Sequence, residues 1–316
     1  MTLLWLCVGL AALAAGNVWM KKGVMSVAVT AHMPTLIYSM MTVLLAGCYG
    51  IVFAASAAVQ RQSAFLLLMV LMSSVYYAIL AGAITSVIRP VAVQLIVWKR
   101  EGLVIGVCLL SLIFAGRETA GAGHPDIVVG KGYGILFLGI MFAEMFAMLA
   151  TSMSGYRKVR RERPRSVAFS CLLAALGFVL MVCAGLVTTE QAEYFAGLQN
   201  THPAVCGMAV GIAVGMIRIP ELFKELKCGG RRIMSSLWGP ASLMLSGGLG
   251  ISCLIMPVTI SYTVEMAAIF ALIMLVMYAV CGVLRKRTGR IQAVVLIAVC
   301  SEMLMWLIVR LSKGLY

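Results

Sequence analysis

The sequence predicts an all-α membrane protein, a polytopic bundle of 10–11 transmembrane helices. Of its 316 residues, 62% are hydrophobic and 11% are charged, whereas soluble domains carry about 25% charged residues. Its mean hydropathy is +1.03. Eleven apolar runs of about the length of a membrane span follow one another along the chain. They lie near 3–20, 35–58, 64–80, 82–98, 102–116, 132–153, 167–188, 203–222, 235–256, 264–284 and 291–310.

The runs at 64–80 and 82–98 are close together, with Gly82 as the turn residue between them. Seventeen residues at 1.5 Å each give about 25 Å, which is enough for a thin or tilted span. The first run is followed by Lys21 and Lys22 instead of being preceded by positive charge. This order predicts a permanent first helix and not a cleaved signal peptide.

Basic residues gather in the short loops between the runs. The strongest cluster lies within 157–165, and the positive-inside rule places it in the cytoplasm. Counting eleven spans from this loop also puts the N-terminus in the cytoplasm, with Lys21 and Lys22 as the exception. The net charge of +14 is therefore explained by topology and not by nucleic-acid binding. We expect a multi-pass protein of the plasma (inner) membrane whose partner is the lipid bilayer.

Weak internal symmetry divides the sequence into two halves. Leu6–Lys21 resembles Phe137–Ser152 when Gly9 is aligned with Gly139. We therefore predict a first helical repeat at 1–116, a connecting loop at 117–131, and a second repeat with an extra helix at 132–316. Inverted five-helix repeats of this kind build many secondary transporters.

Glu144 is the first candidate for a functional residue because it lies in the middle of the run 132–153. An ionised carboxylate is costly at that depth, so such residues usually face the bundle interior and serve ion or substrate paths. We predict that Glu144 couples transport to a proton or another cation. A structural alternative is that it pairs with a neighbouring helix and fixes the packing.

Arg89 and Pro90 are the second candidates, as a substrate-binding pair in the run 82–98. Proline removes a helix hydrogen bond, and a cation beside such a break could hold an anionic group of the solute. Arg89 could equally form an ion pair with Glu144 or extend to the interface. Arg218 and Pro220 repeat the pattern, but their place at a basic helix end favours a topological role.

Three more polar residues within the runs complete the predicted substrate-binding set: Asn17, Gln94 and Glu302. Glu302 has the same alternatives as Glu144, while Asn17 and Gln94 could line a cavity or link helices through hydrogen bonds. The ten cysteines show no CxxC and no Cys/His ligand spacing. The sequence therefore predicts no metal site and no cofactor.

One stretch resembles a known family. Tyr76–Gly116 is similar in layout to the third-to-fifth helix region of the drug/metabolite transporter superfamily, EamA-like branch, with Pro90, Glu101 and Gly116 in the places of its proline, its cap and its helix end. Gly139–Phe146 resembles the first helix of the small multidrug resistance proteins. In that resemblance Glu144 takes the place of their coupling glutamate, which binds a proton and a cationic substrate in turn.

Together these features predict a secondary active transporter that moves a small organic metabolite by alternating access, coupled to protons, and not an enzyme. Two other classes stay open. A membrane-embedded enzyme acting on a lipid or isoprenoid would need clustered Asp, His or Asn at one interface. A non-catalytic membrane subunit would pair its intramembrane charges with those of a partner.

Overall fold

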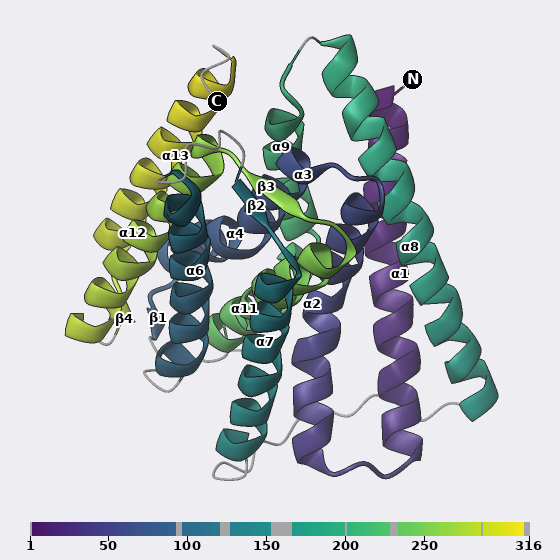
Figure 1. Ribbon diagram of the computed structural model, residues 1–316. Helices are drawn as coiled ribbons and strands as arrows, with labels where there is room; N and C mark the ends of the chain where they lie inside the picture. The colour runs from purple at the N-terminus through teal and green to yellow at the C-terminus, as the bar shows by residue number, and fades with distance from the viewer. Residues whose placement is uncertain are drawn as a thin grey trace.

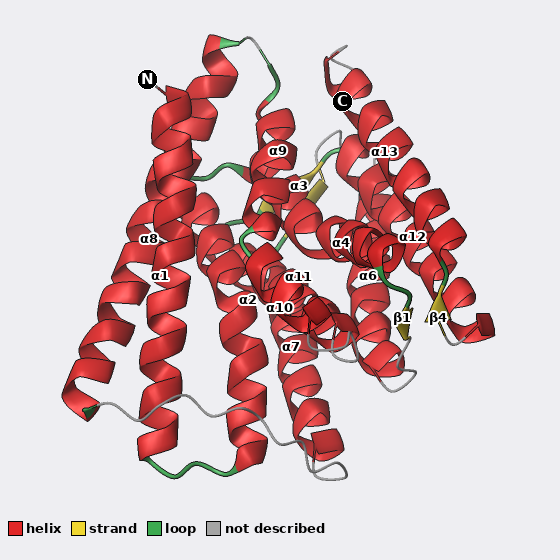
Figure 2. Ribbon diagram, turned by 180° about the vertical axis from the view of Figure 1, so that it is seen from behind, coloured by secondary structure: helices red, strands yellow, loops and turns green. Residues whose placement is uncertain are grey.

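The structure is a computed structural model that describes residues 2–92, 97–120, 127–152, 166–199, 201–227, 233–285 and 287–312. It is a bundle of long helices with two short strand pairs (Figures 1 and 2). The all-α membrane bundle predicted from the sequence is confirmed. Among the described residues, nine helical segments are long and apolar enough to span a bilayer.

The elements of the first half run from the N-terminus to Ser152: α1 (Thr2–Thr30), α2 (Thr35–Val59), α3 (Ser63–Leu71), the π-helical turn η1 (Met72–Tyr76), α4 (Tyr77–Ile88), β1 (Val91–Ala92), the π-helical turn η2 (Trp98–Gly102), α6 (Leu103–Ala120), β2 (Ile127–Val129) and α7 (Lys131–Ser152). Those of the second half are α8 (Val167–Leu198), α9 (Pro203–Met216), α10 (Ile219–Lys227), α11 (Ile233–Ile255), β3 (Val258–Ile260), α12 (Tyr262–Arg285), β4 (Arg287–Thr288) and α13 (Arg290–Ser312).

The prediction of two helices at 64–80 and 82–98 is wrong. Phe65–Ile88 is one helical span, and Gly82 lies inside it and not at a turn. The helix ends at Ile88, and the backbone of the next residue, Arg89, is extended (φ −145°, ψ 125°). A residue before proline disfavours the helical conformation, so Pro90 ends this helix instead of breaking it in the middle.

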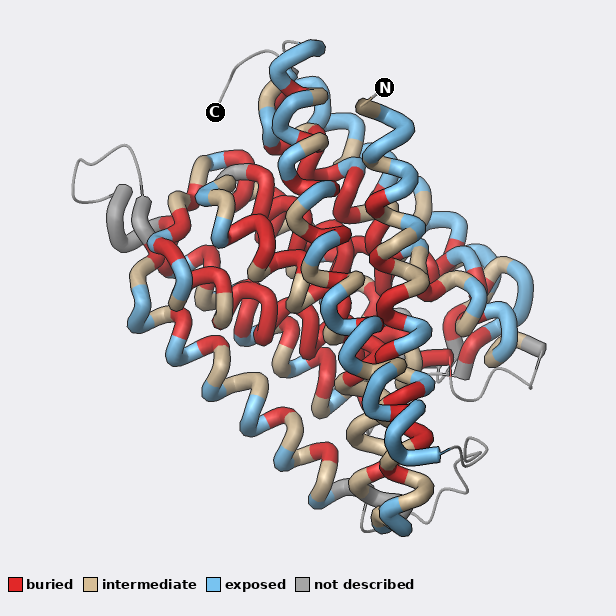
Figure 3. The backbone as a smooth tube through the Cα atoms, turned by 90° about the vertical axis from the view of Figure 1, so that its right-hand side faces the viewer, coloured by how far each residue is buried: buried red, intermediate tan, exposed pale blue. Residues whose placement is uncertain are grey.

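Two segments form the centre of the bundle: α3–η1–α4 and α11. Nearly all of their residues are buried, and Figure 3 shows buried backbone concentrated in the middle of the molecule. Both segments are apolar on every side, which suits a helix surrounded by other helices. α2 and α7 pack on α11, while α9 packs on α3 and α13 packs on α4.

These contacts keep their pattern when the two halves are exchanged. The contact of α2 with α11 corresponds to that of α9 with α3, and α7 with α11 corresponds to α13 with α4. α1 packs on α8 and α6 on α12, so each of these pairs joins the halves. The antiparallel pairs β1–β4 and β2–β3 also correspond, and they lie at opposite ends of the bundle (Figure 1). The arrangement is therefore that of an inverted repeat.

Helices α1 and α8 pack against each other along most of their length (Figure 1). The backbones approach closely at Gly16 and Gly177. A Cβ on Gly16 would lie 2.8 Å from the carbonyl oxygen of Gly177, and one on Gly177 would lie 2.4 Å from the amide nitrogen of Met20. Small residues allow such contacts between membrane helices, where packing replaces the hydrophobic effect as the driving force.

The apolar span Pro203–Leu226 is interrupted between α9 and α10. α9 begins after His202, whose ring accepts the backbone N–H of Ala204 and caps the helix. Burial lowers the pKa of His202, which favours the neutral ring that this hydrogen bond requires. The helix then stops at Met216 and resumes at Ile219, with Pro220 in the first turn of α10, where proline is tolerated.

Candidate functional site

Glu144 lies on the inner face of α7. It follows Phe137 by seven residues and precedes Met148 by four, and all three side chains are buried. This spacing places them on one side of the helix, which packs on α11. Only 1% of Glu144 is exposed. The structure therefore turns the acid predicted from the sequence toward the centre of the bundle.

The Glu144 carboxyl group contacts α11 through Ser242. The Ser242 hydroxyl lies within hydrogen-bond distance of Glu144 Oε1 and also of the Gly239 carbonyl oxygen, at 2.8 Å. A serine hydroxyl has a single proton, and a carbonyl oxygen can only accept. Both hydrogen bonds form together only when Glu144 is neutral and donates to Ser242. When Glu144 is ionised, Ser242 can donate to it and release Gly239, so the same contact serves both forms.

A second buried acid lies beside the same part of α11. Glu101 in η2 is 1% exposed and forms an ion pair with Arg100, at 2.5 Å. A Cβ on Gly239 would lie 3.3 Å from Glu101 Oε1, so the acid packs directly on the α11 backbone. Glu101 and Arg100 both act electrostatically on Glu144. With both acids ionised, this group of three would carry a net charge of −1, which a proton or a cation would neutralise.

Arg218 reaches α11 from the break between α9 and α10. Its side chain is buried, and Nη1 donates to the Leu237 carbonyl oxygen at 3.3 Å. Pro240 lies inside α11, and it leaves the carbonyl of Ser236 without its usual intrahelical donor. The segment Leu237–Ser242 therefore lies between two buried acids and a buried arginine. We call this segment and its charged neighbours the α11 site.

The other predicted site residues lie away from Glu144. Arg89 and Pro90 are exposed at the end of α4, and Glu302 is exposed on α13. Asn17 is buried on α1, and its side-chain oxygen has no hydrogen-bond partner among the described residues. Gln94 lies outside the described residues. The substrate-binding set predicted from the sequence therefore stays a prediction, with its members on several separate elements.

Sequence reasoning missed two members of the α11 site. Glu101 follows Lys99 and Arg100 and was interpreted only as a helix cap, although its neighbours from Leu103 onward already form an apolar helix. Ser242 is one of several small polar residues in α11, and the sequence gives no sign that it alone faces an acid. A serine near a proline inside an apolar helix is the only available signal.

No metal-ligand cluster is present in the part of the chain that the structure describes: no group of three or more His, Cys, Asp or Glu side chains converges. Calcium takes six to eight oxygen ligands, usually with several carboxylates. The α11 site offers two carboxyl groups, with Arg100 beside one of them and Arg218 bonded to the same segment of α11. This small number of carboxyl groups suits a proton or a monovalent cation better than a divalent one.

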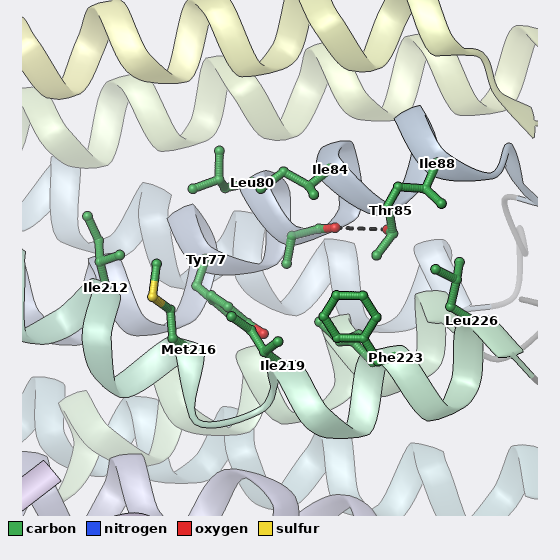
Figure 4. A pocket seen from close by; sticks show the side chains of 12 residues that line it. Tyr77, Leu80, Ile84, Thr85, Ile88, Ile212, Met216, Ile219, Phe223 and Leu226 are labelled. Atoms are coloured by element: carbon green, nitrogen blue, oxygen red, sulfur yellow. Dashed lines mark hydrogen bonds between the residues drawn. The ribbon is translucent and has the colours of Figure 1, made fainter. Parts of the chain in front are cut away.

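A cavity of about 150 Å³ lies between α4, α9 and α10 (Figure 4). Its wall is apolar, with the ring of Tyr77 on one side and the side chains of Ile84 and Phe223 nearer its other end. The Thr85 hydroxyl bonds back to the Ala81 and Gly82 carbonyls and presents no free polar group. This cavity is separate from the α11 site and lacks charged lining.

Comparison with known proteins identifies the fold. The structure is similar to the sodium-calcium exchanger NCX_Mj, with a TM-score of 0.61 and 18% identity over 96% of this chain and 97% of that one. It is also similar to the H⁺/Ca²⁺ exchanger CAX, with a TM-score of 0.66 and 9% identity over 98% of this chain and 86% of that one. No family model matches the chain. No curated protein sequence matches it either.

The protein thus has the fold of these cation exchangers, a membrane helical bundle with internal repeats. The two neighbours are exchangers and not enzymes, in agreement with the expectation that this chain is not an enzyme.

The resemblance to the drug/metabolite transporter superfamily and to small multidrug resistance proteins is wrong, because that superfamily differs from the exchangers in fold. Tyr76–Gly116 covers all of α4, β1, η2 and most of α6, and Pro90 follows the end of α4 instead of lying inside a short helix. Glycine, alanine and a single acid recur in membrane helices of many folds, so a match of these residues alone does not identify a family.

Proposed function

We propose that the protein is a secondary transporter that moves an inorganic cation in exchange for, or together with, protons, and that Glu144 is the coupling carboxyl group. The observation that carries this proposal is the Glu144–Ser242–Gly239 contact inside an exchanger fold. That contact accommodates both the neutral and the ionised acid, as a group that gains and loses a proton in each cycle must. Glu101 adds a second carboxyl group beside the same segment of α11.

A monovalent cation is the first candidate substrate. The neighbouring structures are a sodium-calcium exchanger and an H⁺/Ca²⁺ exchanger, so Ca²⁺ is the second. The two carboxyl groups of the α11 site are fewer than calcium sites usually provide. The small organic metabolite predicted from the sequence lacks comparable support, because neither of two apolar cavities in the described part of the chain is lined by a buried acid.

The orientation proposed here differs from that predicted from the sequence. Merging 64–80 and 82–98 into one span removes one crossing, which leaves ten spans in the described part of the chain: the nine long apolar segments and α6. The basic segments at 157–165 and 285–290, and the end of α10, then share one side with Lys21 and Lys22, without exception. The positive-inside rule makes this side the cytoplasm, and the N-terminus lies on the other side of the plasma membrane.

Transport by purified protein in liposomes tests the proposal. An outward or inward pH gradient is imposed, and uptake of Na⁺, K⁺ and Ca²⁺ is followed together with the internal pH. We expect cation movement coupled to proton movement in the wild type. Glu144→Gln keeps the shape of the side chain but cannot ionise, so coupled transport should fall by at least about tenfold, the effect of about 1.4 kcal/mol.

Glu302→Gln is the matched control, because it makes the same change on an exposed helix face. It should leave transport within about twofold of the wild type. Equal losses in the two variants, or unchanged pH coupling in Glu144→Gln, would overturn the role of Glu144. Uptake of an organic solute in place of any cation would restore the metabolite prediction.

A further inference from the structure

We propose that the apolar cavity between α4 and α10 holds an acyl chain of an anionic phospholipid, whose headgroup lies at the basic end of the cavity beside Arg89 and Lys227. This lipid would be a specific partner of the protein and not its transported substrate. Three observations support the assignment: the shape of the cavity, its position on the surface of the bundle, and the charges at one end.

The cavity is an elongated space between two helices. One wall is α4 from Tyr77 to Ile88, and the other is formed by the end of α9 and by α10. The residues of α10 that face it, Ile219 to Leu226, are spaced as one helix face. From Leu80 to Ile88 this wall is about 12 Å long, at 1.5 Å per residue. An apolar cavity of about 150 Å³ accommodates a benzene-sized molecule, so a segment of an acyl chain fits.

The cavity opens on the outer surface of the bundle. Ile84, Ile88, Met216 and Phe223 line it and are 47–53% exposed. In a membrane protein such a surface faces lipid tails, which contact apolar side chains without a free-energy penalty. Two polar side chains line it: the Thr85 hydroxyl is bonded to its own helix, and the Tyr77 hydroxyl is buried without a hydrogen-bond partner among the described residues. A hydrocarbon chain is therefore the occupant that this surface favours.

Basic residues follow both walls at the same end. Arg89 comes directly after Ile88 and is exposed, and Lys227 comes directly after Leu226 at the end of α10. Lys224 is exposed one turn earlier on α10. The acids of α10 weaken this positive charge only in part. Glu221 forms an ion pair with Lys21. The remaining acid, Glu225, carries one negative charge, whereas Lys224 and Lys227 carry two positive charges. Juxtamembrane Lys and Arg attract anionic headgroups with about 1 kcal/mol each.

Lipid binding to the purified, delipidated protein tests this assignment. Bound lipids are counted by native mass spectrometry, and thermal unfolding is measured with phosphatidylglycerol and with phosphatidylcholine of the same acyl chains. We expect phosphatidylglycerol to bind about 25-fold more tightly, about fivefold for each of the two charges, and to raise the Tm further. Inorganic phosphate, which lacks a tail, should have no effect. Equal binding of the two lipids, or stabilisation by phosphate alone, would overturn the proposal.

Two variants separate the headgroup contact from the tail contact. Arg89→Gln combined with Lys227→Gln should weaken phosphatidylglycerol by about 25-fold, about fivefold per charge, and leave phosphatidylcholine unchanged. Ile84→Trp fills the cavity and should lower the bound count for both lipids. Arg290→Gln and Ile291→Trp, at the start of α13, are the matched controls and should change neither. Controls as effective as the cavity variants would show bulk lipid adsorption and refute a defined site.

Discussion

Helices α7 and α13 hold corresponding places in the two halves, and each carries one acid near its middle. Glu144 on α7 is 1% exposed and contacts Ser242, whereas Glu302 on α13 is exposed. On α13 the buried side chains include Leu296, Cys300 and Leu307. Glu302 follows Cys300 by two residues and so points about 200° away from the inner face. A position near the middle of a spanning helix is therefore not enough to make an acid functional. The acid must also lie on the helix face that packs against the rest of the bundle.

The largest expected effect concerns the acid that accompanies Glu144. Glu101→Ala removes an ion-pair partner of Arg100 next to α11 and should lower the free energy of unfolding by about 3 kcal/mol, since removing one member of a buried ion pair is strongly destabilising. Glu302→Ala should cost nothing. Thermal or denaturant unfolding in detergent measures both. A loss below about 1 kcal/mol for Glu101→Ala would mean that the buried Glu101 contributes no more to the free energy of unfolding than the exposed Glu302.

The opposite sign is expected on α13. Glu302→Leu replaces an acid that faces the membrane and should raise the free energy of unfolding by up to about 2 kcal/mol, because a charged side chain near the centre of a spanning helix is unfavourable. Unfolding in lipid nanodiscs is the appropriate measurement. A destabilised Glu302→Leu variant would show instead that this acid contacts a partner protein, as the class of membrane subunits requires.

The smallest effect distinguishes two serines on α11. Ser242→Ala removes the hydroxyl shared by Glu144 and Gly239 and should cost about 1–2 kcal/mol. Ser246 is equally buried, but its hydroxyl donates only to the carbonyl of Ser242 within the same helix. Ser246→Ala should therefore change the free energy of unfolding by less than about 0.5 kcal/mol. Equal costs for the two variants would remove the special role of Ser242.

The sequence was sufficient for the fold class, because apolar runs of about 20 residues have few structural solutions in a membrane. It was insufficient for the helix count near Gly82. A glycine is compatible with both a turn and a buried helix, and in the fold Gly82 lies in a buried helix beside Leu237 and Tyr278. Pro90 was correctly identified as a helix breaker, but its break falls at the end of the span and not inside it.

The candidate site was predicted in part. Glu144 was identified from its depth alone, and the stripe of Phe137, Glu144 and Met148 could have shown that it faces inward. The same reasoning applied to Glu302 would have placed it outward. Glu101 and Ser242 could not be assigned to Glu144, because η2, α7 and α11 are far apart in sequence and meet only in the fold. The family could not be identified from motifs made of residues common to all membrane helices.

The close antiparallel contact of α1 and α8 limits how the molecule can change shape. With backbone against backbone at Gly16 and Gly177, neither helix can rotate or tilt without displacing the other, so the two must shift as a single rigid unit. The ion pair of Lys21 with Glu221 ties that unit to α10, which follows Arg218 and its bond to α11. A displacement of the outermost helices would thus be transmitted to the backbone beside Glu144.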